Sequence, residues 1–238
     1  MALMFFITLL FNLFALLLIL IRPKLFQTKL FRPMITNFKL SVIPLFILIG
    51  TLALQLFFAW LSSATSFAFL GILSSLILIV GLIVWLVFLP NAGYLVTELN
   101  LTHREIDKVE VPIWYDIVAV LSLAISGVLN TALNIVLLQF TFIIYFDPAN
   151  FAAINTPTFW LLTWLVFPVL SFGIYLGRYI RFNTWDLFHP LQFVQKLVKH
   201  FREKEHRREA FVFTILLGVF LALFYALTFL NPLWEIIK

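Results

Sequence analysis

The side chains best suited to chemistry in this protein are acids and arginines that border long apolar segments. Glu98 follows the third such segment, Asp116 lies near the start of the fourth, and Arg178, Arg181 and Asp186 lie at or just past the end of the fifth. Two arginines three residues apart share a helical face, and guanidinium groups bind phosphate or carboxylate through paired hydrogen bonds. Neighbouring acids can hold a cation or move a proton. The pattern predicts one site for a polar or anionic ligand.

The same residues also fit a structural role. Isolated charges are costly near hydrocarbon and therefore need partners, and ion-pair networks use the same residue types as functional sites. We favour a network for the set as a whole, and name Arg178 as the member that contacts a ligand. Either role places Arg178 within salt-bridge reach of Glu98 or Asp116.

The segments that must position these residues are long enough to cross a lipid bilayer. Hydrophobic residues make up 63% of the 238 residues and charged residues only 11%, against about 25% in soluble domains. A spanning helix needs about 20 apolar residues, and a helix satisfies its own backbone hydrogen bonds in lipid. Six segments qualify: Leu3–Ile21, Ser41–Leu61, Phe67–Leu89, Ile113–Leu138, Phe159–Ile180 and Phe211–Leu230. We predict an all-α integral membrane bundle of six transmembrane helices, one domain over residues 1–238.

Basic residues gather on one side of this bundle. Except for Lys238, every lysine and arginine lies in or beside residues 22–40, 90–112 and 181–210, which follow the first, third and fifth segments. Connections rich in lysine and arginine stay in the cytoplasm, so both termini are predicted to lie outside. The expected partners of these connections are membrane lipids with anionic head groups, not nucleic acid.

Part of the third connection, residues 191–208, is predicted to form a basic amphipathic helix. Its apolar stripe consists of Leu191, Val194, Leu197, Val198 and Phe201. Lysine, arginine and histidine side chains occupy the opposite face. A helix of this kind lies in the interface of a membrane that contains anionic lipid.

The third apolar segment leads directly into Pro90 and the stretch Asn91-Ala92-Gly93-Tyr94. Proline removes a backbone donor, and asparagine and glycine favour turns, so the helix is predicted to break here. The chain stays half apolar to Leu101, which indicates a re-entrant or interfacial segment over residues 90–101. Asn91 and Tyr94 therefore join the candidate ligand-binding residues.

The fourth segment carries a polar stripe. At about 100° per residue, Asp116, Ser126, Asn130 and Asn134 fall in one sector of the helix. The stripe either lines a polar path or forms hydrogen bonds with neighbouring helices. We favour the hydrogen bonds, with Gln55 of the second segment as the expected partner.

Three ordered motifs carry a resemblance to a known family. They are Leu89-Pro90-Asn91-Ala92-Gly93-Tyr94 with Thr97-Glu98, then Trp114-Tyr115-Asp116, then Gly173-Ile174-Tyr175-Leu176-Gly177-Arg178 with Asn183-Thr184-Trp185-Asp186. Over roughly residues 65–230 the chain resembles an uncharacterised bacterial membrane family, domain of unknown function 1361. Gly93 stands where that family has a second proline, and His103 lies further past the acid than the family's histidine. The resemblance implies a multi-pass protein of the bacterial cell membrane and no particular activity.

Several classes of activity lack their motifs. There is no Walker A loop, no Gly-x-Ser-x-Gly elbow, no His-Glu-x-x-His, no dinucleotide-binding glycine fingerprint and no cysteine. We expect no cofactor and no metal site. The leading hypothesis is a membrane protein that binds or translocates a polar or anionic ligand, such as a lipid head group. The alternatives are an intramembrane enzyme acting on a lipid-linked substrate, with Glu98 or Asp116 as acid or base, and a non-catalytic subunit of a larger complex. The oligomeric state stays open.

The distribution of basic residues makes the topology testable. A reporter that is active only in the periplasm is expected to be active when fused after Asn150, and silent when fused after Lys108 or Lys199. The opposite pattern would reverse the orientation of the whole bundle.

Overall fold

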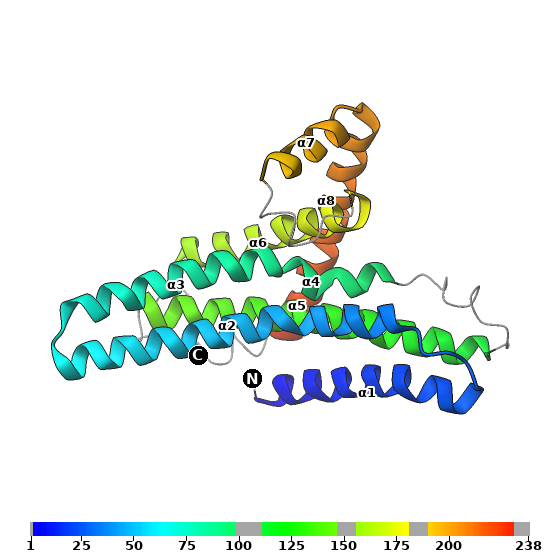
Figure 1. Cartoon of the computed structure of the whole chain (residues 1–238), viewed down its shortest axis with the longest axis horizontal. Coiled ribbons are helices and arrows are strands. Elements are labelled where there is room, and N and C mark those ends of the chain that lie inside the picture. The colour runs from blue at the N-terminus through cyan, green and yellow to red at the C-terminus, as the bar shows by residue number, and fades with distance from the viewer. Residues whose placement is uncertain (1, 99–110, 147–155, 181–189, 231–238) are drawn as a thin grey trace.

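The computed structural model describes residues 2–98, 111–146, 156–180 and 190–230, and those residues form helices without a strand. The long helices are α1 (Ala2–Phe26), α2 (Arg32–Thr65), α3 (Ala68–Phe88), α5 (Ile113–Phe146), α6 (Pro157–Tyr175) and α8 (Lys204–Tyr225). The short ones are α4 (Pro90–Tyr94), η1 (Leu95–Glu98), η4 (Leu176–Ile180), α7 (Pro190–Phe201) and η6 (Ala226–Leu230). Six helices, counted with their short extensions, are long and apolar enough to cross a membrane. The predicted six-helix membrane fold is confirmed (Figure 1).

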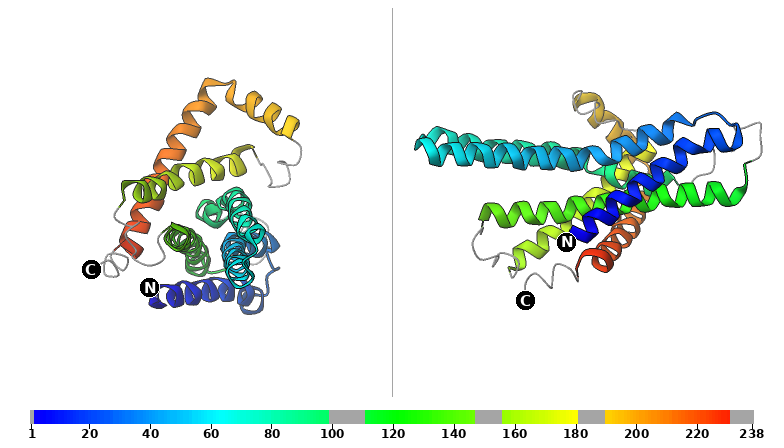
Figure 2. Two further views of the ribbon diagram at one scale, coloured as in Figure 1. Left: turned by 90° about the vertical axis from the view of Figure 1, so that its left-hand side faces the viewer. Right: turned by 90° about the horizontal axis from the view of Figure 1, so that it is seen from below.

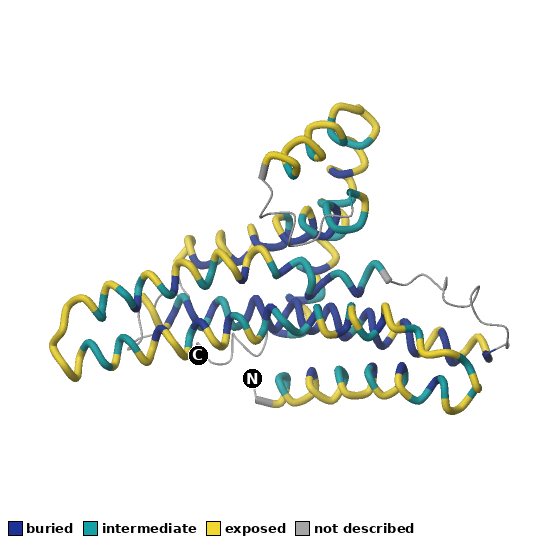
Figure 3. Tube along the Cα trace, viewed as in Figure 1, coloured by how far each residue is buried: buried dark blue, intermediate teal, exposed yellow. Residues whose placement is uncertain are grey.

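Helix α5 is the centre of the bundle. In its most apolar window 83% of the residues are buried, against 17–39% in the other five spanning helices. Figure 2 shows the other long helices arranged around α5, and Figure 3 shows that its buried positions continue along most of its length. Small residues between Ser122 and Asn134, among them Gly127, let neighbouring backbones approach α5 closely. The outer helices expose many large apolar side chains, as lipid-facing helices do.

Several helices are longer than predicted. Helices α2 and α5 each contain 34 residues, which at 1.5 Å per residue makes them about 51 Å long. The hydrocarbon core of a bilayer is only about 30 Å thick. The ends of these two helices therefore project beyond it, and much of the predicted connection 22–40 is helical.

The chain continues as helix past Pro90 and does not turn there, contrary to the prediction. Leu89 keeps right-handed helical dihedrals, and its N–H donates to the Trp85 carbonyl at 2.8 Å. Pro90 stands at the start of α4, where a missing N–H costs no hydrogen bond. Helix α4 packs against α2, α5 and α6 before the chain tightens into η1. Residues 90–98 thus extend α3, with Ala92, Gly93 and Leu95 buried, and residues 99–101 lie outside the described ranges.

The amphipathic helix is also shorter than residues 191–208. Helix α7 ends at Phe201, and residues 204–208 belong to the first turns of α8. Leu191, Val194 and Val198 of the predicted apolar stripe are exposed. The rest of α7 packs against η4 and α8 (Figure 1). One face of α7 therefore packs against protein, and three apolar side chains of its predicted stripe stay exposed.

The close approach of α4 to α5 depends on Gly127. A Cβ atom added there would lie 2.7 Å from Leu95 Cβ and 3.1 Å from the Ala92 carbonyl oxygen, and neither atom belongs to the flexible end of a side chain. Gly127→Ala is expected to destabilise the protein by about 1–3 kcal/mol and to lower its melting temperature in detergent. Gly50→Ala in α2 is the control, because nothing lies within 4 Å of its added Cβ. Equal melting temperatures for the two variants would contradict the close packing of α4 on α5.

Candidate functional site

Arg22 and Asp116 form a buried ion pair between α1 and α5. Arg22 Nε donates to Asp116 Oδ1 at 2.9 Å, and the two side chains are only 7% and 1% exposed. Asp116 lies in the first turn of α5, where the helix dipole favours a negative charge. The Tyr115 hydroxyl donates to the Leu18 carbonyl at 2.7 Å. These contacts fasten the end of α1 to the start of α5.

Deeper in the bundle, a cluster of polar side chains joins α1, α2 and α5. The Asn12 amide donates to Asn130 Oδ1 at 2.8 Å, and Asn12 Oδ1 accepts from the Ser126 hydroxyl at 2.6 Å. Asn130 Nδ2 donates to Asn12 Oδ1 and to Ser41 Oγ, both at 3.0 Å. Ser41 donates in turn to the Ala92 carbonyl of α4 at 3.1 Å. Two members of the polar stripe are thus engaged with neighbouring helices.

The last member of the stripe, Asn134, is buried and hydrogen-bonded as well. Its Oδ1 accepts from the Trp85 indole of α3 at 2.9 Å, and its Nδ2 donates to the Asn130 carbonyl at 2.8 Å. Gln55 is not the partner of the stripe, and this prediction was wrong. Gln55 exchanges hydrogen bonds with Ser74 of α3 at 3.3 and 2.9 Å. Ser41 already lies level with Asn130, so Gln55 lies about 21 Å further along α2 and faces α3.

The remaining predicted site residues that the structure describes lie in three short elements, α4, η1 and η4. Asn91 and Tyr94 are half-buried in α4, and Tyr94 packs against the main hydrophobic core. Arg178 is half-buried in η4, at the end of α6. Glu98 ends η1, and its side chain lies outside the described part of the structure. Arg181 and Asp186, the other two predicted site residues, also lie outside the described part of the structure.

Asp116 pairs with Arg22 of α1, whereas the sequence pointed to Arg178 as an arginine within reach of Glu98 or Asp116. Because the Glu98 side chain lies outside the described part of the structure, a contact between Arg178 and Glu98 stays a prediction. Figures 1 and 2 show that α5 begins beside the end of α1, while α6 and η4 end near α7. Asp116 and Arg178, which were expected at one site, therefore belong to two regions. Asp116 is part of the seam between α1 and α5, and Arg178 lies beside α7 and α8.

A second polar cluster, which the sequence analysis did not identify, joins α6, α7 and α8. The Tyr175 hydroxyl lies 2.8 Å from His200 Nε2 and donates to the His206 carbonyl at 3.3 Å. His206 Nδ1 lies 3.1 Å from the His200 carbonyl, which can only accept, so Nδ1 carries a proton. The two imidazole rings stack with centroids 4.2 Å apart. Burial and then the neighbouring His206 lower the pKa of His200, against the opposing effect of Glu209 and Glu203.

Beside this cluster, an open groove of about 390 Å³ lies between α6, the end of α7 and the first turns of α8. Its lining consists of Phe172, Phe201, Arg207, Ala210, Phe211 and Thr214. The rings of Phe172 and Phe201 stack with centroids 6.1 Å apart. Arg207 is exposed, whereas the Thr214 hydroxyl is buried and has no hydrogen-bond partner among the described residues. The groove combines apolar walls with a cationic edge.

The contact between α1 and α5 could have been predicted from the spacing of polar residues in the sequence. Asn12 and Arg22 are ten residues apart on α1, and Asp116 and Ser126 are ten residues apart on α5. Two antiparallel helices in contact bring such equally spaced polar pairs together. The contact of His200 with Tyr175 had no comparable signal, because it depends on how α7 folds back along α8.

The described residues contain no group of three or more histidine or acidic side chains arranged to hold a metal ion.

Comparison with known families places the chain in one of them. The family model described as "Protein of unknown function (DUF1361)" matches residues 36–224. The chain therefore belongs to this family, and the matched region runs from α2 into α8. No curated protein and no solved structure matches the chain.

The buried ion pair has a consequence for stability. Removing one member of a buried pair costs about 3–5 kcal/mol, while replacing both members by apolar residues is often neutral. Asp116→Asn and Arg22→Met are each expected to lower the melting temperature in detergent, and the double variant Arg22→Met/Asp116→Leu is expected to recover most of the loss. Lys24→Met, at an exposed position of α1, serves as the control for removing a positive charge. Additive losses in the double variant would show that the two residues are not energetically coupled.

Proposed function

We propose that this member of the DUF1361 family binds an anionic lipid in the groove between α6, α7 and α8. The protein would reside in the cell membrane of a bacterium, with both termini outside and this groove on the cytoplasmic side. The proposal keeps the sequence hypothesis of an anionic ligand such as a lipid head group. It leaves Asp116 of α5 out of the site, keeps Arg178, and adds Arg207 of α8.

The observation that carries the proposal is the combination of apolar walls and an arginine edge in one groove. Phe172, Phe201 and Phe211 offer the walls a hydrocarbon chain needs, and Arg207 stands where a head group would follow that chain. Guanidinium groups form paired, charge-assisted hydrogen bonds with phosphate oxygens.

The exposed side chains of helix α7 support the same proposal. Lys196 and Lys199 are exposed, as are Leu191 and Val198 on the apolar side. A helix with basic and apolar faces lies at the membrane interface and is attracted by anionic lipid. Such a helix would bring anionic head groups next to the groove that it helps to form.

Binding fits the geometry better than translocation or acid–base catalysis at Asp116. A polar path needs side chains that can hydrate a passing ligand, but Asn130 and Asn134 are buried and bonded to neighbouring helices. A general acid or base must reach its substrate, but Asp116 is buried in its contact with Arg22. Arg178 remains in the proposal as a second arginine for the head group, because η4 packs against α7.

Adjacent arginines allow a matched test. Affinity of the purified full-length protein for phosphatidylglycerol, and for phosphatidylcholine of the same chain length, would be measured by native mass spectrometry. Arg207→Gln is expected to weaken phosphatidylglycerol binding about tenfold, the loss of roughly 1.5 kcal/mol for a hydrogen bond to a charged group. Arg208→Gln removes the same charge from an exposed residue that does not line the groove, and is expected to change the affinity little.

Two results would overturn the proposal. One is a wild-type protein that binds the two lipids equally well. The other is an equal loss of phosphatidylglycerol binding in Arg207→Gln and Arg208→Gln, which would indicate attraction by surface charge alone. The same assay on Arg178→Lys, which keeps the charge but loses the planar fork, tests whether Arg178 also contacts the head group.

A further inference from the structure

We infer that a separate pocket between α3, α5 and α6 binds the hydrocarbon chain of a membrane phospholipid. This pocket has a volume of about 290 Å³ and is lined by one face of each helix, with side chains taken from within residues 78–86 of α3, 138–146 of α5 and 159–166 of α6. It lies in the half of the bundle where α5 ends and α6 begins, and thus away from Arg207 and α7. It is a second site, and its evidence is independent of the groove beside α7.

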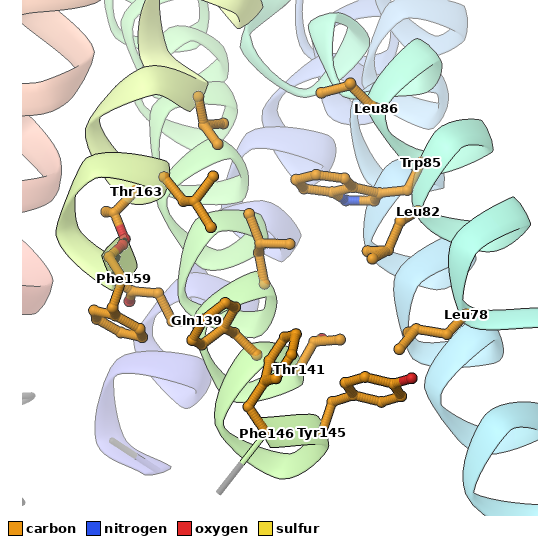
Figure 4. Close-up of a pocket in the computed structure, with 14 residues that line it drawn as sticks. Leu78, Leu82, Trp85, Leu86, Gln139, Thr141, Tyr145, Phe146, Phe159 and Thr163 are labelled. Atoms are coloured by element: carbon orange, nitrogen blue, oxygen red, sulfur yellow. Dashed lines mark hydrogen bonds between the residues drawn. The ribbon is translucent and has the colours of Figure 1, made fainter. Parts of the chain in front are cut away.

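The walls of the pocket are apolar and aromatic. Leu78 and Trp85 are buried on the α3 side, and Phe159 is buried on the α6 side (Figure 4). Phe142 of α5 also lines the pocket and is half-buried. All these side chains belong to helices that span the membrane. The solvent next to the pocket is therefore the hydrocarbon of the bilayer, and water is excluded from it.

The polar atoms in the lining are already engaged inside the protein. Gln139 donates to Thr163 Oγ1 at 3.1 Å and accepts from the Tyr225 hydroxyl at 2.9 Å. Thr141 donates to the Leu137 carbonyl at 2.8 Å. Among the described residues, no buried side-chain nitrogen or oxygen in the lining is without a hydrogen-bond partner. A polar ligand would lose hydrogen bonds on entering, whereas a hydrocarbon chain would lose none.

The rim shows how a chain can enter. Leu86 on α3 and Leu162 on α6 both line the pocket and are 42% and 45% exposed, so the opening between these helices faces the bilayer. Tyr145 lines the pocket near the end of α5, and its hydroxyl donates to Ser75 at 3.3 Å. Tyrosine at a helix end marks the membrane interface. A phospholipid with its head group at this interface can direct one chain sideways into the pocket.

The experiment uses full-length protein in nanodiscs made with a phosphatidylcholine that carries a diazirine at the end of one acyl chain. After irradiation, labelled residues are mapped by peptide mass spectrometry. Labelling is expected to be concentrated on the pocket walls of α3, α5 and α6. Leu82→Trp adds an indole to a half-buried lining position and is expected to abolish this labelling. Ile83→Trp adds the same ring at the next position, which is 60% exposed to lipid, and is expected to leave it intact.

Thermal melting distinguishes a filled pocket from a damaged fold. Leu82→Trp is expected to melt no lower than Ile83→Trp; if it melts lower, Val166→Phe fills the pocket from the α6 wall and replaces it in the labelling experiment. Labelling spread evenly over the exposed faces of the bundle, or wall labelling that persists in a folded, filled variant, overturns the inference. Because phosphatidylcholine is the probe, failure here leaves the phosphatidylglycerol test of Arg207 unaffected, and the reverse also holds.

Discussion

The structure depends on the hydrogen bonds of Asn130, a polar side chain at the centre of a bundle surrounded by lipid. A buried amide without partners is costly in an apolar environment, so its neighbours must lie where the bonds can form. Asn12 of α1 and Ser41 of α2 both meet this requirement at 2.8–3.0 Å. Individual hydrogen bonds between membrane helices are worth only about 0.6 kcal/mol. Their importance here is geometric, because satisfying one amide fixes the positions of two helices against α5.

The same cluster explains why the chain can continue past Pro90. A short helix that tightens into a 3₁₀ turn leaves carbonyl groups without the usual partners. The Ser41 hydroxyl supplies a donor to one of them, the Ala92 carbonyl. Gly127 lets α4 lie against α5, and Gly173 of α6 leaves room for the ring of Pro90. Helix α4 is thus stabilised by polar and close-packing contacts that the local sequence alone does not reveal.

The fold could be predicted from the sequence much more fully than the site. Apolar length gave the six spans, because a lipid solvent imposes that length on each helix. The Ser126, Asn130 and Asn134 stripe was also visible, since helical periodicity requires no knowledge of neighbours. The partners were not visible: Gln55 was expected and Ser41 found, since the relative depth of two helices depends on tertiary packing. The groove beside α7 depends on the fold-back at residues 202–203, for which the sequence has no periodic pattern.

Arg22 and Arg207 show that the same type of side chain can have different roles when it is buried and when it is exposed. Arg22 lies near the end of the apolar helix α1, and its buried guanidinium requires a carboxylate as its partner. Its charge is therefore committed to holding α1 against α5. Arg207 stands in the first turns of α8, exposed at the edge of an apolar groove, where water can solvate it until an anion arrives. Desolvating Arg207 would cost free energy only when a ligand binds. Under this condition a charge can discriminate between ligands. The contacts between α1 and α5 are thus fixed internal ones, whereas the groove between α6, α7 and α8 is the surface on which the proposed function would place an anionic lipid.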